Sequence, residues 1–160
     1  MLEKLKLEFA KYLHKKLQEH IKNRPPDFTV GSAYLKRWWL LPRNRFFNVY
    51  YHNFRVSDDD RALHDHEYIN VSFLLDGEYI EHTEKGVFHR KTGALVMRRP
   101  STLHRIELLP NVSSRWNEKE CPTWTLFITG PRVRTWGFKI DNQWLDYKTY
   151  IAKYGAQLNN

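Results

Sequence analysis

From Phe28 onward the chain is a series of short strand-like runs separated by turn-forming residues, and this pattern limits its fold most. The turn signals include Asp76-Gly77, Thr92-Gly93 and Gly130-Pro131. The runs predict strands near 28–31, 34–41, 46–56, 63–75, 78–83, 87–90, 94–98, 103–109 and 123–129. Many short strands joined by regular turns favour an all-β sandwich or barrel.

A helical pattern precedes these strands. Within residues 1–24, apolar side chains recur at helical spacing until Asn23-Arg24-Pro25-Pro26 stops the pattern, which predicts a helix over 2–23. We expect this helix to pack on the outside of a β-domain that spans 28–140. Its long lysine-rich side also suits a dimer or partner helix.

Composition bounds the class of protein. A chain of 160 residues, 41% of them hydrophobic, suffices for one domain with a core. Residues 141–160 extend that domain, with a short helix predicted near 146–156. The single cysteine, Cys121, excludes an internal disulfide and a Cys-rich zinc module, and it suits a reducing cytoplasm. No apolar run approaches about 20 residues, so we expect neither a membrane span nor a secretion signal.

The net charge of +8 indicates which kinds of molecule the protein would bind. A basic protein prefers anions, which include nucleic acid, nucleotides and small phosphorylated or carboxylated molecules. The alternative is a soluble protein that is simply basic.

The stretch His64-Asp65-His66 carries the clearest chemical signal. If 63–75 is one strand, alternation places a polar set of side chains on one face: His64, His66, Tyr68, Asn70 and Ser72. We expect this face to point inward, because it carries imidazole rather than lysine or glutamate. Gly77 would then permit a tight hairpin into the next strand.

His104 is the third candidate ligand. It shares a strand face with Ile106 and Leu108, and therefore lies among inward-pointing residues. Three neutral imidazoles suit iron, zinc, copper, nickel or manganese, and they leave coordination positions open for water or substrate. The alternative is a polar strand face whose histidines are hydrogen-bonded internally.

These residues resemble the motifs of the cupins, which are small β-barrels of the double-stranded β-helix or jelly-roll type. His64-x-His66 with Asn70 and Gly77 follows the spacing of the first cupin motif. The second motif is followed loosely by Gly93, Pro100 and His104. Asn70 stands where cupins usually have a glutamate ligand. The resemblance implies a cupin-like barrel with a three-histidine metal site, similar to that of the thiol dioxygenases, or a barrel that has lost its metal.

Four segments also resemble a group of small cupin-like proteins that are common in phages and prophages. They are Tyr34–Trp38, Leu63–Glu67, Thr125–Arg132 and Trp136–Phe138. This resemblance implies a compact barrel in a bacterial or phage-infected cytoplasm, and it implies no settled function.

Three residues are candidates for proton transfer: His82, Glu81 and His52. Alternation directs only one of Glu81 and His82 inward, and of the two we favour His82. His52 shares a strand face with Tyr50 and Phe54. The triplet Asp58-Asp59-Asp60 would add a carboxylate ligand or a general base, or it is a solvated turn.

Arginine suggests an anionic substrate, because its forked donors pair with carboxylate or phosphate. Arg98 and Arg99 are expected to orient the anion, and Arg37 lies beside Trp38-Trp39. The candidate substrate-binding set is completed by Asn70 and Tyr50. The alternative is that these strand-end charges are merely solvated.

The leading hypothesis is a metal-dependent, dioxygenase-like enzyme that acts on a small anionic molecule. His64, His66 and His104 would hold one divalent transition metal. Iron, which we favour, would support dioxygen chemistry, whereas zinc or manganese would support isomerisation or hydrolysis. A second hypothesis is a non-catalytic pocket protein that binds a nucleotide or nucleic acid, such as a host molecule. A third is a structural protein that forms a homodimer through its barrel face or its helix.

Overall fold

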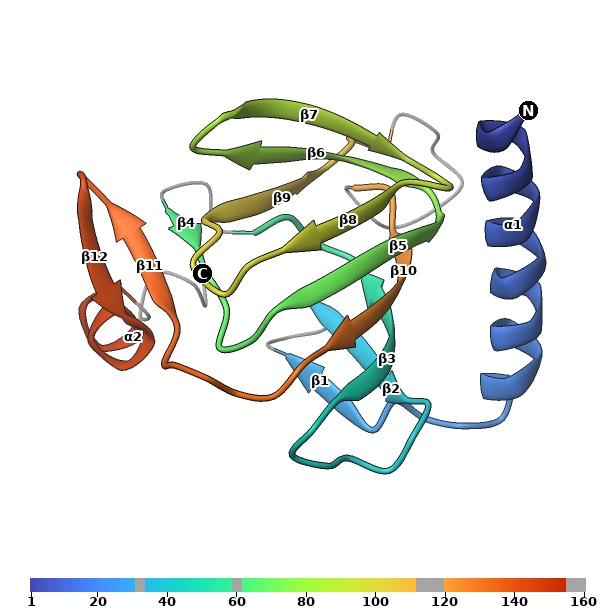
Figure 1. Ribbon diagram of the computed structural model, residues 1–160, viewed down its shortest axis with the longest axis horizontal. Helices are drawn as coiled ribbons and strands as arrows, with labels where there is room; N and C mark the ends of the chain where they lie inside the picture. Colours follow the sequence, from blue (N-terminus) through green and yellow to red (C-terminus); the bar gives the residue numbers. More distant parts are fainter. Residues whose placement is uncertain (31–33, 59–61, 112–119, 155–160) are drawn as a thin grey trace.

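Strands dominate the computed structural model, which describes residues 1–30, 34–58, 62–111 and 120–154. In these residues they form two six-stranded antiparallel sheets (Figure 1). The first sheet runs in the order β1 (Phe28–Val30), β2 (Leu35–Trp39), β3 (Asn48–Phe54), β10 (Thr123–Thr129), β5 (Asn70–Asp76) and β8 (Leu95–Arg98). The second runs in the order β12 (Gln143–Asp146), β11 (Gly137–Ile140), β4 (Leu63–His64), β9 (His104–Leu108), β6 (Glu78–Thr83) and β7 (Gly86–Lys91).

The helix α1 (Leu2–Ile21) covers the outer face of the first sheet (Figure 1). Its buried residues Ala10 and Ile21 join a core cluster with Trp38, Tyr51 and Leu75. The N-terminal turns pack less, since Leu2 and Leu5 remain exposed and only the later part of the apolar stripe is used. None of the described helices is both long and apolar enough to cross a membrane.

A second core cluster lies between the sheets. Leu74 of β5 packs with Tyr79, Ile106 and Leu108, which belong to the second sheet. The two sheets therefore face each other as a jelly roll, although they do not close into one continuous barrel. The predicted all-β class with an outer N-terminal helix is confirmed.

The predicted strand 63–75 is wrong, because it is two strands in different sheets. β4 ends at His64 and β5 begins at Asn70, so the chain crosses from one sheet to the other between them. Backbone bonds fix the start of the crossing: Asp65 N donates to Gly137 O, and His66 N donates to Pro100 O, each at 3.0 Å. The crossing contains no glycine or proline, so the sequence offered no break signal there.

The hairpin expected at Gly77 is also wrong. Gly77 does form a tight turn, with φ +87°, but the turn joins β5 of the first sheet to β6 of the second. A Cβ at this position would lie 2.8 Å from Thr123 Cγ2. The close contact with β10, together with the positive φ, explains why the turn requires glycine.

The C-terminal residues extend the second sheet. A hairpin of β11 and β12 turns at Asp141 and Asn142, whose φ angles are +48° and +63°. β11 pairs with β4, and the helix α2 (Tyr147–Tyr154) follows inside the predicted range 146–156. These two strands are not predicted from the sequence, although Asp-Asn is a turn signal that tolerates positive φ.

Asp65 fastens this hairpin, and its removal should destabilise the fold. The buried carboxylate accepts hydrogen bonds from Gly137 N at 2.7 Å, from Trp144 Nε1 at 3.0 Å and from Arg134 Nη1. Asp65→Ala should lower the free energy of unfolding by about 2–4 kcal/mol, because it leaves several donors without an acceptor. Urea denaturation measures this loss. Asp76→Ala, at an exposed carboxylate, is the control, and an equal loss in both variants would contradict the role of Asp65.

Candidate metal centre

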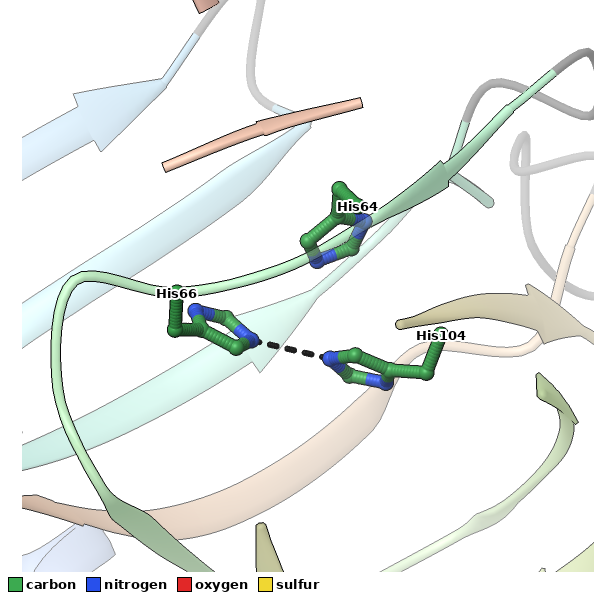
Figure 2. A group of neighbouring side chains, drawn as sticks. All are labelled: His64, His66 and His104. Carbon is green, nitrogen blue, oxygen red and sulfur yellow. Dashed lines mark hydrogen bonds between the residues drawn. The ribbon is translucent and has the colours of Figure 1, made fainter. Parts of the chain in front are cut away.

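His64, His66 and His104 meet at one point between the sheets (Figure 2). One ring nitrogen from each lies within 4.8 Å of the others, and the Nε2 atoms of His66 and His104 are 2.9 Å apart. His64 and His104 are directly paired across β4 and β9. The structure thus brings together the three predicted ligands from two strands and a crossing segment.

The geometry fits a metal ion. Two nitrogen ligands at about 2.1 Å from one metal, about a right angle apart, are separated by about 3 Å. The distance between His66 and His104 has this size, and in the absence of a metal it is also the length of a hydrogen bond between two neutral imidazoles. The donor set therefore suits a transition metal without excluding a hydrogen-bonded pair.

The cluster favours neutral imidazoles, which are the metal-binding form. Burial, followed by the nearby His64 and His104, lowers the pKa of His66 well below its ordinary value. Burial also lowers the pKa of His104 to about 4, although Glu81 opposes part of that shift. Both rings are consequently neutral at neutral pH, and each has one ring nitrogen whose lone pair can bind a metal.

Glu81 of β6 supports His104 from behind. Its Oε1 lies 3.2 Å from His104 Nδ1, on the side of the ring away from His66. Arg98 donates to the same oxygen through Nε at 2.7 Å and through Nη2, and Arg90 Nε donates to Oε2 at 2.8 Å. Burial tends to raise the pKa of Glu81, but contacts with His104 and Arg98 outweigh it and lower the value to about 2. A carboxylate behind a histidine ligand fixes its tautomer and orientation.

Asp58 lies beside His64 as Glu81 lies beside His104, with Asp58 Oδ2 3.7 Å from His64 Nδ1. Its carboxylate accepts hydrogen bonds from the Tyr34 hydroxyl and, at 2.6 Å, from Ile106 N. Asp58 is therefore a held carboxylate rather than part of a solvated turn, while Asp59 and Asp60 lie outside the described residues. Tyr34 was not singled out from sequence, because nothing local indicates a contact with a residue so distant along the chain.

The histidines line a cavity of about 420 Å³, which is the size of a small-molecule site. Its polar wall includes Arg37, His52, Asp58 and Arg98 in addition to the histidines. The apolar wall is formed by Phe28, Val30, Leu35, Phe54, Ile106, Phe127 and Trp136.

Of the candidates for proton transfer, His52 lines the cavity and Glu81 lies behind His104. The preference for His82 over Glu81 is corrected by the strand register. Glu81 is 1% exposed on the inner face, whereas His82 Nε2 contacts Glu107 Oε2 at 2.6 Å on the other face.

Only some of the candidates for substrate binding line the cavity. Arg37 and Arg98 line the cavity, whereas Arg99, next to Arg98, points away and is exposed. Tyr50 and Asn70 are buried but are not among the lining residues. Tyr50 stacks on His52, and the amide of Asn70 has no hydrogen-bond partner among the described residues.

Comparison with known proteins gives the fold and no closer identity. The sequence matches no known protein family and no characterised protein. A proposed mannose-6-phosphate isomerase from Ralstonia eutropha is 15% identical over 66% of this chain and 92% of its own length, with a TM-score of 0.50. DMSP lyase DddQ from Ruegeria pomeroyi is 14% identical over 66% of this chain, with a TM-score of 0.49, and the match spans only 53% of the lyase. An uncharacterised Klebsiella pneumoniae protein with a double-stranded β-helix domain is 16% identical over 68% of this chain and 87% of its own, with a TM-score of 0.48.

These likenesses concern architecture alone. The sheet order, together with the likeness to the Ralstonia structure, gives the fold as a jelly roll of two facing antiparallel sheets. In this chain a cluster of three histidines lies within the cavity.

The lowered pKa of Glu81 predicts an acid-sensitive contribution to stability. A depressed carboxylate pKa stabilises the fold above the unfolded value of about 4.5, and the contribution fades as pH falls toward about 2. In metal-free protein, Glu81→Gln should therefore lower the free energy of unfolding at pH 7 by an amount on the order of 3 kcal/mol. The gap to the wild type should narrow steadily below about pH 4.5.

Urea denaturation at pH values from 7 to 3 measures this gap. Glu107→Gln is the matched control, because Glu107 also contacts a histidine but is half exposed. A gap for Glu81→Gln that stays constant with pH would contradict the stabilising role of the ionised carboxylate.

Proposed function

We propose that His64, His66 and His104 bind one divalent transition metal and that the protein is a metal-dependent enzyme acting on a small anionic molecule. The observation that carries the proposal is the convergence of three ring nitrogens within 4.8 Å on the wall of a cavity. Three protein ligands leave coordination positions free, which is the arrangement of catalytic rather than structural sites.

The proposed metal is iron, with zinc or manganese as alternatives. When bound, iron would supply dioxygen chemistry of the dioxygenase type, whereas zinc or manganese would act as a Lewis acid for isomerisation or hydrolysis. Three neutral ligands would leave the ion with its full positive charge, which favours an anionic substrate.

The chain's own residues suit this role. Arg37 adds positive charge to the cavity wall, whereas the charge of Arg98, which also lines the cavity, is balanced by Glu81. Asp58, the lining carboxylate beside His64, is the proposed acceptor of a proton from a bound molecule. The other lining carboxylate, Glu67, is already paired with Arg132 at 2.9 Å.

Metal analysis tests the proposal. Protein stripped with a chelator should take up about one equivalent of Fe²⁺, Zn²⁺ or Mn²⁺, measured by calorimetry and elemental analysis. Alanine at His64, His66 or His104 should weaken binding by at least about tenfold, because each removes one ligand. His89→Ala is the matched control, since His89 lies on β7 and is 42% exposed. Wild-type protein that binds none of these metals would refute the proposal.

A second candidate function is the binding of single-stranded nucleic acid. It is supported by the end of β2 and the segment that follows it, where Arg43 lies over the Trp39 ring, 5.4 Å from its centroid, and Arg45 lies over the Phe46 ring, 4.9 Å from its centroid. Stacked arginine and aromatic side chains are a platform for bases.

Fluorescence anisotropy with a labelled oligonucleotide tests this candidate. The double variant Arg43→Gln, Arg45→Gln should weaken binding by about tenfold, while Arg105→Gln on the second sheet should not. Binding should also fall steeply with salt. Equal binding by both variants would refute the candidate. Homodimer formation and a phage origin stay predictions of the sequence.

A further inference from the structure

The two arginines of the cavity differ in whether their charge is already neutralised. Arg98 is 3% exposed, and two of its nitrogens donate to Glu81 Oε1. The Nε and Nη2 donors of its guanidinium are therefore already occupied by Glu81. Glu81 also receives Arg90, so this carboxylate is saturated with donors.

Arg37 has no such partner. Among the described residues no carboxylate lies within ion-pair distance of it, and its Nε donates a hydrogen bond to His52 Nε2 at 2.8 Å. Its guanidinium lies over the Tyr50 ring, 4.7 Å from the centroid, and 6.0 Å from that of Phe28. Aromatic faces hold the side chain in place but do not neutralise it as a carboxylate would. Arg37 keeps most of its five N–H donors for a ligand.

His52 serves as the support of Arg37. Because its Nε2 accepts the Arg37 bond, the proton of the neutral ring is on Nδ1. His52 is 2% exposed, lines the cavity, and has no hydrogen-bond partner at Nδ1 among the described residues. Burial and the adjacent Arg37 lower the pKa of His52 well below its ordinary value, so the ring stays neutral. This arrangement makes His52 a positioning residue for Arg37 rather than a proton-transfer group.

The rest of the cavity wall, which is largely aromatic, indicates that the uncharged part of the ligand is apolar. Phe28, Phe54 and Phe127 line the same cavity as Arg37, and His66 faces it as well. The Phe127 ring lies between the two groups: its centroid is 4.9 Å from that of His52, which supports Arg37, and 6.1 Å from that of His66. A molecule held at Arg37 would thus lie along aromatic rings and reach the histidines.

We infer that the cavity binds a small carboxylate with an apolar body, whose carboxylate pairs with the free fork of Arg37 and whose body lies against the aromatic wall toward the histidine cluster. The inference rests on the proposed function in that it names the anion acted on at that site. A planar carboxylate matches one guanidinium fork and one charge, whereas a phosphate dianion would leave a charge uncompensated against an apolar wall.

Calorimetry with three probes of increasing length tests this inference: benzoate, phenylacetate and 3-phenylpropanoate. At least one should bind the full-length wild-type chain, and its neutral amide should bind at least tenfold more weakly, because it forms no charge-assisted pair. Arg37→Gln should weaken carboxylate binding at least tenfold, and Arg37→Lys should lie between. Lys36→Gln is the matched control, since it removes the same charge from the opposite face of β2 and should change binding less than twofold.

Several outcomes would overturn the inference. They are the failure of all three carboxylates to bind, equal binding of acid and amide, tighter binding of phenyl phosphate, and Arg37→Gln binding as well as the wild type. The comparison of acid with amide uses wild-type protein alone, so it decides the matter even if Arg37→Gln does not fold.

The same titrations in chelator-treated protein separate this inference from the metal proposal. Carboxylate binding that depends on Arg37 in a chain that takes up no metal would support the inference and refute the metal site. Metal uptake together with carboxylate binding that is unchanged in Arg37→Gln would support the metal site and refute the inference.

Discussion

The bonds of Asp65 are the constraint on which the rest of the structure depends. The chain must leave β4 and cross to the first sheet immediately after His64, and the Asp65 carboxylate ties this crossing to the C-terminal hairpin through Gly137 N, Trp144 Nε1 and Arg134. With Asp65 turned to the hairpin, the residues on either side of it turn to the cavity. The pairing of His64 with His104 then completes the cluster. The aspartate between the two histidines therefore has a structural role, and the two histidines line the cavity.

The polar interior follows a simple division of charge. Glu81 accepts hydrogen bonds from Arg98 and Arg90 and contacts His104. The positive charge of Arg98 on this side of the cavity is therefore balanced within the protein. The other side holds Arg37, supported by a neutral histidine and aromatic rings. Because an ionised group without a counter-charge is costly in a partly buried place, such a group points to a ligand rather than to stability.

The sequence predicted the class of fold and the three central histidines because both depend on local patterns. The alternation of polar and apolar residues located β3, β9 and β10 closely. The His-x-His spacing indicates a candidate pair of metal ligands from three neighbouring residues alone. What it could not predict depends on residues distant along the chain. The split of 63–75, the turn at Gly77 that changes sheet, and the choice of Glu81 over His82 are all decided by which strands pair. The roles of Arg98 and Arg37 are likewise decided by where Glu81 and His52 lie.

The shortness of β4 has a thermodynamic consequence. This strand has only two residues, and it is held on one side by the hairpin strand β11 and on the other by β9. Short segments of this kind open at a lower free energy than the sheets around them. An ion bound by His64, His66 and His104 would connect this segment to β9, and linkage requires that closing the segment and filling the site favour each other by the same amount. Occupancy of the centre would thus also stabilise the C-terminal hairpin, whose strand β11 pairs with β4 at His64.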